Sequence, residues 1–214
     1  MRQIQLPVPQ DASLNKAYDR QAWTLYDKLT YAAAGQSQLI FFQTGRSGGR
    51  TYEDTNFPGA GGSLPNGMQF TIQEVQFRFF PGATVLVGAV GAAASNPGFF
   101  TRDITAVGQR GFVELNYLSK NFIEDGPLDR FPPDTRLMGF AAAADATTAA
   151  AALQTLVNYA QWGGKPYRVF DLLLAPQVAF SMTVSWPGGV VATPSTVAGS
   201  LGCYLKGVLD RRPQ

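Results

Sequence analysis

The stretch APQVAFSMTVSWPGG, residues 175–189, decides the fold class of this chain. Large apolar residues occupy every second position: Val178, Phe180, Met182, Val184 and Trp186. Small residues alternate with them. Because the side chains of a strand alternate between its two faces, this pattern predicts a half-buried antiparallel strand whose apolar face packs into a core.

Composition extends the strand prediction to most of the chain. The 214 residues suffice for one sizeable core, and 23 Gly, 14 Pro and 15 Phe favour many turns in a strand-rich body. Charged residues make up 15% of the chain, against about 25% in typical soluble domains. We therefore expect a mainly β protein with a weakly charged surface, part of which is covered by partners.

The pattern along the chain predicts a β-sandwich with one or two inserted helices. Residues 1–12 contain two prolines and predict an extended N-terminal arm, and residues 13–214 predict a single domain. Apolar spacings of three and four predict a helix within residues 15–34 and another over residues 147–161, the second as an insertion. No repeat of 20–50 residues is present, which argues against solenoids and propellers.

One predicted strand changes its alternation midway. In FTIQEVQFRFF, Ile72 shares a parity with Phe70, whereas Val75 begins a new apolar series on the other parity. An extra residue in one strand of a pair produces such a change. The sequence therefore predicts a β-bulge near Gln73 and Glu74.

The residue types that carry most catalysis are scarce. The chain has no histidine, the commonest general base and metal ligand, and Cys203 alternates with leucines as a buried residue would. The adjacent carboxylates Glu53–Asp54 and Glu124–Asp125 lie in Gly- and Pro-rich segments, where acidic residues usually form turns. The sequence thus predicts no catalytic, cofactor-binding or metal site, and a protein that is not an enzyme.

Charge and hydropathy limit the partners. A net charge of +2, from 17 basic and 15 acidic residues, provides no strong field for nucleic acid, so we expect no sequence-specific nucleic-acid binding. The first residues lack the apolar run of a signal peptide, and no window reaches the length of a membrane span. We expect a chain that is made in a cytoplasm and kept or assembled there.

Several segments, in order, resemble the major capsid proteins of tailless icosahedral phages with a jelly-roll coat, of the tectivirus-like and finnlakevirus-like kind. They are LIFFQTG, TNFPGAGGSLPNGMQFTIQEVQFRF, GFVELNYLSKNF, DGPLDRFPP, LLLAPQVAFSMTVSWPGG and GCYLKGVLDRRPQ. Together they span about residues 39–214. The likeness lies in a leading apolar strand, a TN loop, an LPNG turn and a terminal LKGVLDR strand that follows an APQVAF strand.

The resemblance implies a single jelly roll of two antiparallel four-stranded sheets. It also implies a major capsid protein that assembles in the host cytoplasm into trimers or pseudo-hexameric capsomers and then into the shell of the virion, without catalysis or cofactors. Other capsid proteins are the expected partners, and an internal membrane is left open as a further one.

Contacts between copies would be carried by aromatic and arginine side chains. The candidates are Tyr52, Phe57, Phe99, Phe100, Phe131, Arg211 and Arg212. The aromatic candidates are expected in loops that one subunit does not wholly shield. The alternative for each ring is that it folds back onto its own sandwich.

Three other functions remain open at this stage. A minor capsid or spike protein would share the fold. A carbohydrate-binding β-sandwich would need a solvent-facing platform built from rings such as Trp23, Trp162 and Trp186, which do not share one strand face. An enzyme that uses only carboxylates would have to bring distant acids such as Glu74 and Glu114 together.

Overall fold

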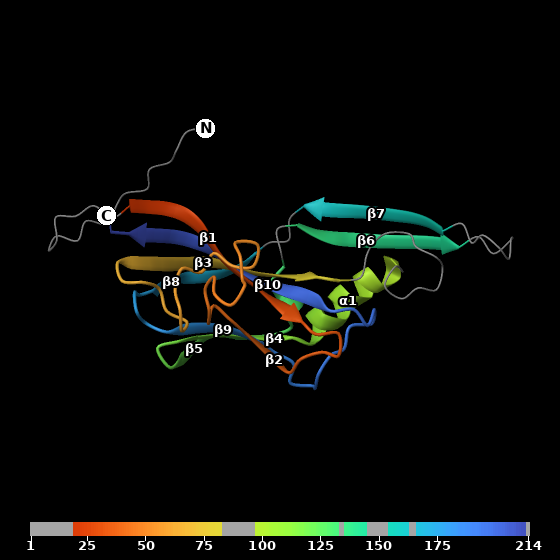
Figure 1. Cartoon of the computed structure of the whole chain (residues 1–214). Helices are drawn as coiled ribbons and strands as arrows, with labels where there is room; N and C mark the ends of the chain where they lie inside the picture. The colour runs from red at the N-terminus through yellow and green to blue at the C-terminus, as the bar shows by residue number, and fades with distance from the viewer. Residues whose placement is uncertain (1–18, 83–96, 133–134, 145–153, 163–165, 213–214) are drawn as a thin grey trace.

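The computed structural model describes residues 19–82, 97–132, 135–144, 154–162 and 166–212. Two four-stranded antiparallel sheets form the body of the molecule (Figure 1). The first sheet has the strand order β1 (Asp19–Tyr31), β10 (Gly199–Arg211), β3 (Met68–Phe80) and β8 (Tyr167–Leu174). The second sheet has the order β2 (Gln38–Phe41), β9 (Phe180–Ser185), β4 (Phe112–Tyr117) and β5 (Lys120–Asp125).

The strand order defines a jelly roll. Along the chain the strands alternate between the two sheets, except that β4 and β5 form a hairpin within the second sheet. The first and last strands of the roll, β1 and β10, pair along their whole length. This winding of eight strands into two facing sheets is the jelly-roll architecture, and it confirms the predicted fold class.

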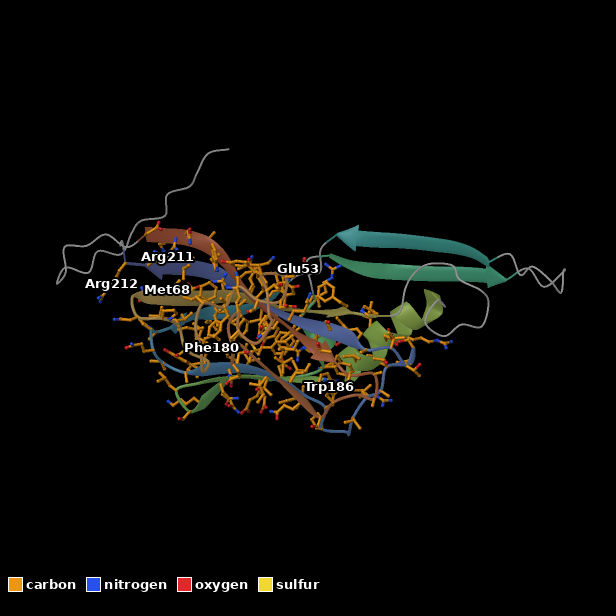
Figure 2. The ribbon with its side chains drawn as sticks, viewed as in Figure 1. Glu53, Met68, Phe180, Trp186, Arg211 and Arg212 are labelled. Carbon is orange, nitrogen blue, oxygen red and sulfur yellow. The ribbon has the colours of Figure 1, made fainter. Side chains whose placement is uncertain are left out.

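The core lies between the two sheets, and the stretch that first indicated strands supplies part of it. Phe180, Met182, Val184 and Trp186 are buried, which confirms the predicted apolar face from residue 180 onward. Val178 is only partly buried, and Thr183 on the opposite parity is buried as well. The indole N–H of Trp186 donates to the carbonyl of Val107 at 3.1 Å, which ties this strand to a helix. Phe180 and Trp186 are labelled in Figure 2.

The predicted β-bulge is present in β3. Lys206 pairs with Glu74 and the next residue, Gly207, pairs with Ile72, so Gln73 is the extra residue. The side chains of Ile72 and Val75 are both fully buried, because the extra residue between them lets residues of even and of odd number face the core on the two sides of the bulge.

The helix predicted within residues 15–34 is wrong, because this segment forms strand β1. Its inward positions include Leu25, Asp27 and Tyr31, which follow the period of two. A buried carboxylate in the middle of the apolar series conceals the alternation, and the remaining apolar residues happen to fit helical spacing.

The helix predicted over residues 147–161 is also wrong for the part that the structure describes. Strand β7 (Gln154–Trp162) pairs antiparallel with β6 (Thr135–Ala144), and residues 145–153 lie outside the described residues. The insertion is therefore a β-hairpin, placed between β5 and β8 and beside the sandwich in Figure 1. Strand pairing overrides the local preference of the alanines here, and β-formers such as Val157 and Tyr159 favour it.

The described helices are α1 (Pro97–Arg110) and the 3₁₀ turn η2 (Leu128–Arg130). Helix α1 lies between β3 and β4 along the chain, and a proline at its first position suits a helix start. Neither helix in the described part of the chain is long and apolar enough to cross a membrane. The arm predicted over residues 1–12 lies outside the described residues.

Candidate functional site

The structure does not gather the acidic side chains of the described residues into a metal site, although Glu114 lies directly opposite Glu124 in the second sheet. Among the described residues, no three His, Cys, Asp or Glu side chains gather where they could hold a metal ion. Glu74 lies in the first sheet, where it pairs with Arg168 at 3.5 Å, whereas Glu114 lies in the second sheet. The structure therefore does not bring these two glutamates together.

A buried carboxylate and a buried hydroxyl form a structural clamp. Asp103 of α1 accepts hydrogen bonds from the backbone N–H of Ser195 at 2.9 Å and from its hydroxyl at 2.6 Å. Both side chains are fully buried, so the contact fastens α1 to the loop before β10. The hydroxyl in turn accepts from the N–H of Val197 at 3.2 Å, so it both donates and accepts within the fold.

The single cysteine is part of the core, as predicted. Cys203 is fully buried in β10, opposite Asp27 of β1. Burial raises the pKa of its thiol well above the ordinary value, and the negative charge of Asp27 raises it further. A thiol held neutral in this way is a poor nucleophile.

Residues 51–57 cover the outer edge of β1. The side-chain oxygen of Asn56 accepts from the N–H of Tyr26 at 2.8 Å, and the N–H of Asn56 donates to the Tyr26 carbonyl at 3.3 Å. Nearby, the carbonyl of Asp54 accepts from the N–H of Lys28 at 2.7 Å. The loop thus takes the place of a further strand, and we call this covered side of β1 the sealed edge.

A buried ion pair holds that loop in place. Asp27 points inward from β1 and is 1% exposed, and it pairs with the guanidinium of Arg50. The same carboxylate accepts from the backbone N–H of Phe42 at 2.6 Å. Arg50 also donates to the carbonyls of Thr44 and Lys28, at 3.0 and 3.1 Å. One side chain therefore connects β1 to the segment that leads into the loop.

The structure corrects several of the candidate contact residues. Phe57 and Phe131 are expected to be exposed, but their side chains are 1% and 0% exposed and belong to the core. Phe131 lies against Tyr167, with ring centroids 4.4 Å apart. Phe99 and Phe100 are expected in a loop but lie in helix α1, and their side chains are outside the described residues.

The remaining candidates are on the surface. Tyr52 is 65% exposed at the tip of the covering loop, with the guanidinium of Arg46 at 3.9 Å from its ring centre. Arg211 and Arg212 are exposed at one end of the first sheet, near Met68 in Figure 2. Arg211 pairs with Asp19 at 3.4 Å across β1 and β10.

Sequence reasoning missed most of the exposed apolar side chains. Besides Tyr52 they are Trp23, Ile40, Leu118, Phe122, Phe170, Leu173 and Val190. The most exposed is Phe170 of β8, at 102% relative accessibility. The segment KPYRVFDLLLAP did contain a sign that Phe170 is exposed. Arg168 and Asp171 place charges on both parities around it, which is typical of a distorted strand at the edge of a sheet.

Strand β8 bulges at this point. Ile72 of β3 pairs with Leu172 and Glu74 pairs with Arg168, which leaves residues 169–171 opposite the single residue Gln73. Among the described residues, no segment pairs with the outer side of β8. The outer edge of β8 therefore presents Phe170 to solvent, and we call it the open edge.

A small open pocket of about 260 Å³ lies beside the turn between β4 and β5. Its lining residues are Gln43, Gly61, Asn116, Tyr117, Leu118, Ser119, Ala179, Phe180 and Ser181. The two turn residues Leu118 and Ser119 have φ of 53° and 60°, the left-handed region that Asn and Gly normally occupy in such turns. Leu118 is 60% exposed at the rim of this pocket.

No known family model, curated protein or solved structure matches this chain.

Proposed function

We propose that this chain is the major capsid protein of a tailless icosahedral phage and acts by self-assembly, without catalysis. The observation that carries the proposal is the jelly roll itself, a fold that viral coat proteins share with lectins and cupins. Because a fold alone does not determine function, the surface must support the choice.

The surface favours contacts between proteins. Large apolar side chains project from both sheets and from the turns, including Tyr52, Leu118, Phe122 and Phe170. Aromatic side chains such as Tyr52 and Phe170 are of the kind that supplies most of the energy of protein–protein contacts. Their distribution over several faces fits a subunit that contacts more than one neighbour, as a shell subunit does.

A carbohydrate-binding sandwich is less well supported by the aromatic residues. Trp186 is 2% exposed and lies in the core, and Trp23 is 39% exposed on the other sheet. Trp162 ends the inserted hairpin. The described rings of Trp23 and Trp186 therefore form no shared platform for a sugar.

The proposal includes the partners and place that a coat protein requires. Copies of the chain would form trimers or pseudo-hexameric capsomers in the host cytoplasm and then the shell of the virion. Other capsid proteins would contact this shell. A minor capsid or spike role is the alternative within the same class, and the abundance of the chain in purified particles distinguishes the two.

The first experiment is light scattering of the purified chain over a range of concentration and salt, with negative-stain imaging of any large species. We expect discrete trimers, hexamers or shells. A strict monomer under every condition would overturn the proposal, and binding on a glycan array would then identify a carbohydrate-binding module.

A further inference from the structure

Phe170 is placed as a protruding contact residue. Three residues of β8 lie opposite one residue of β3, and the middle one, Phe170, has its side chain fully in solvent. Bulges at sheet edges commonly redirect one side chain, and aromatic side chains dominate the energetics of protein interfaces. A ring held clear of its own subunit by a backbone distortion is suited to insert into another molecule.

The pocket beside the β4–β5 turn is suited to receive such a ring. At about 260 Å³ it is smaller than ordinary small-molecule sites, which start at about 300 Å³, and it is open to solvent. Its rim carries Leu118, an exposed leucine in a left-handed conformation that glycine or asparagine would adopt more easily. Strained residues of this kind persist most often where they serve a function.

The charges next to the two features are complementary. Arg168 lies two residues before Phe170. Its side chain is 83% exposed and pairs with Glu74 at 3.5 Å. Glu114 lies two residues before Asn116 of the pocket, directly opposite Glu124 of β5. Like charges in opposite positions destabilise a sheet, so a cation between Glu114 and Glu124 would relieve their repulsion.

We propose that Phe170 of one copy inserts into the pocket beside the β4–β5 turn of a second copy, where Arg168 meets Glu114 and Glu124. A second copy is the occupant that the charges favour, because the exposed cation of Arg168 accompanies Phe170 and the paired carboxylates of Glu114 and Glu124 lie beside the pocket. Because the protruding residue and the pocket are different surfaces, the contact propagates from copy to copy and closes into a ring where the rotation permits. The inference rests on the proposed self-assembly and names the surfaces that carry it.

The first test compares the association of Phe170→Ala with that of the unaltered chain, by sedimentation over a range of concentrations. We expect an apparent dissociation constant raised by about tenfold or more, because anchor residues dominate interface energies. The melting temperature should not change, since the ring is fully exposed in the subunit. Val190→Ala is the matched control, because Val190 is 61% exposed in a loop and lies outside the proposed contact.

A charge exchange tests the pairing itself. Arg168→Glu and Glu124→Arg should each weaken association, and the two changes together should restore it, because the attraction is recovered with its direction reversed. A double variant as weak as the single ones would overturn the proposed contact. Melting temperatures of all three variants show whether folding is intact.

The turn residues supply a test in which stability and association move in opposite directions. Leu118→Asn combined with Ser119→Gly places residues suited to left-handed φ in the turn, so the melting temperature should rise. Association should nevertheless weaken, because the apolar rim of the pocket is lost. Unchanged association would overturn the role of this pocket.

The outcomes separate this inference from the proposed function. If the unaltered chain is a monomer at all concentrations, both fail. If it assembles and Phe170→Ala assembles equally well, the proposed function stands and only the Phe170 contact is wrong.

Discussion

The two edge strands of the first sheet, β1 and β8, differ in whether their outer edges are covered. On the sealed edge, Asp54 and Asn56 of the loop 51–57 form hydrogen bonds with the outward backbone groups in the middle of β1. On the open edge, the described residues leave the outer side of β8 without a partner, and a bulge presents Phe170. The chain's own loop covers the outer edge of β1, whereas the outer edge of β8 is available for contact with another molecule.

This difference indicates how the fold separates protection from display. Unpaired strand edges can recruit other chains without specificity, and loops or bulges commonly prevent this. The chain uses a loop on β1, where a regular edge would pair indiscriminately. It uses a bulge on β8, which disrupts regular strand pairing and still exposes one specific side chain. Association through the open edge would then depend on side chains more than on backbone pairing.

The largest effect is expected from opening the sealed edge. Asp27→Ala removes the buried partner of Arg50 and the acceptor of the Phe42 N–H. Breaking a buried pair costs about 3–5 kcal/mol, and because the remaining Arg50 side chain is 18% exposed, we expect a loss of up to that size in the free energy of unfolding in denaturant.

The exposed pair on the same strand is the control for this prediction. Asp19 contacts Arg211 at 3.4 Å with its side chain 60% exposed, so Asp19→Ala should change the unfolding free energy by less than about 0.5 kcal/mol. Equal losses in the two variants would show that the ion pair does not hold the sealed edge.

The same carboxylate shows where sequence reasoning failed. Alternation in residues 180–186 and the change of parity around Gln73 were sufficient to predict strands, the bulge and a sandwich, because these signals are local. In β1 the inward residue Asp27 interrupts the apolar series, and its partner Arg50 is distant in sequence. The period of two is hard to recognise in β1 because a charged residue occupies an inward position, and its ion-pair partner lies in a loop whose position the sequence does not reveal.

The surface was harder to predict than the core. Phe57 and Phe131 lie in Gly- and Pro-rich segments that suggested exposure, yet these segments fold onto the sandwich and bury both rings. Phe170 was not singled out in its segment of residues 165–176, and the bulge turns it into solvent. Whether a loop covers a sheet or a strand bulges depends on contacts across the fold, which residue types along the chain do not specify.

An intermediate effect is expected from changing the bulge on which the open edge is built. A Cβ added at Gly207 would lie 1.8 Å from the carbonyl oxygen of Thr71, which is backbone and cannot rotate away. Gly207→Ala should therefore displace β3 around Gln73 and lower the unfolding free energy by about 1–3 kcal/mol.

Gly188→Ala is the matched control, because nothing lies within 4 Å of its added Cβ. This change should leave stability equal or slightly raised, since alanine restricts the unfolded chain. Hydrogen exchange of the β8 amides would show whether Gly207→Ala loosens the open edge. A variant as stable as the control would mean that β3 tolerates a regular register there.

The smallest effect is expected from Cys203, which lies in β10 opposite Asp27 of β1. Its folded-state pKa is raised by burial and by Asp27, so folding favours the neutral thiol. The stability from this preference is complete below the unfolded pKa of about 8.5 and is lost as pH rises beyond it toward the folded pKa. Between pH 7.5 and 9 the unfolding free energy should fall by less than about 1 kcal/mol.

Cys203→Ala should remove this part of the pH dependence. The measurement therefore compares how steeply the unfolding free energy changes with pH in the two proteins, and not their absolute stabilities. A thiol reagent should label the unfolded chain rapidly and the native chain slowly, and Asp27→Ala should accelerate native labelling, because the sealed edge then opens more often. Equal slopes in the two proteins would show that the thiol is not held neutral by the fold. Rapid labelling of the unaltered native chain would show that the loop over β1 does not close this side of the core.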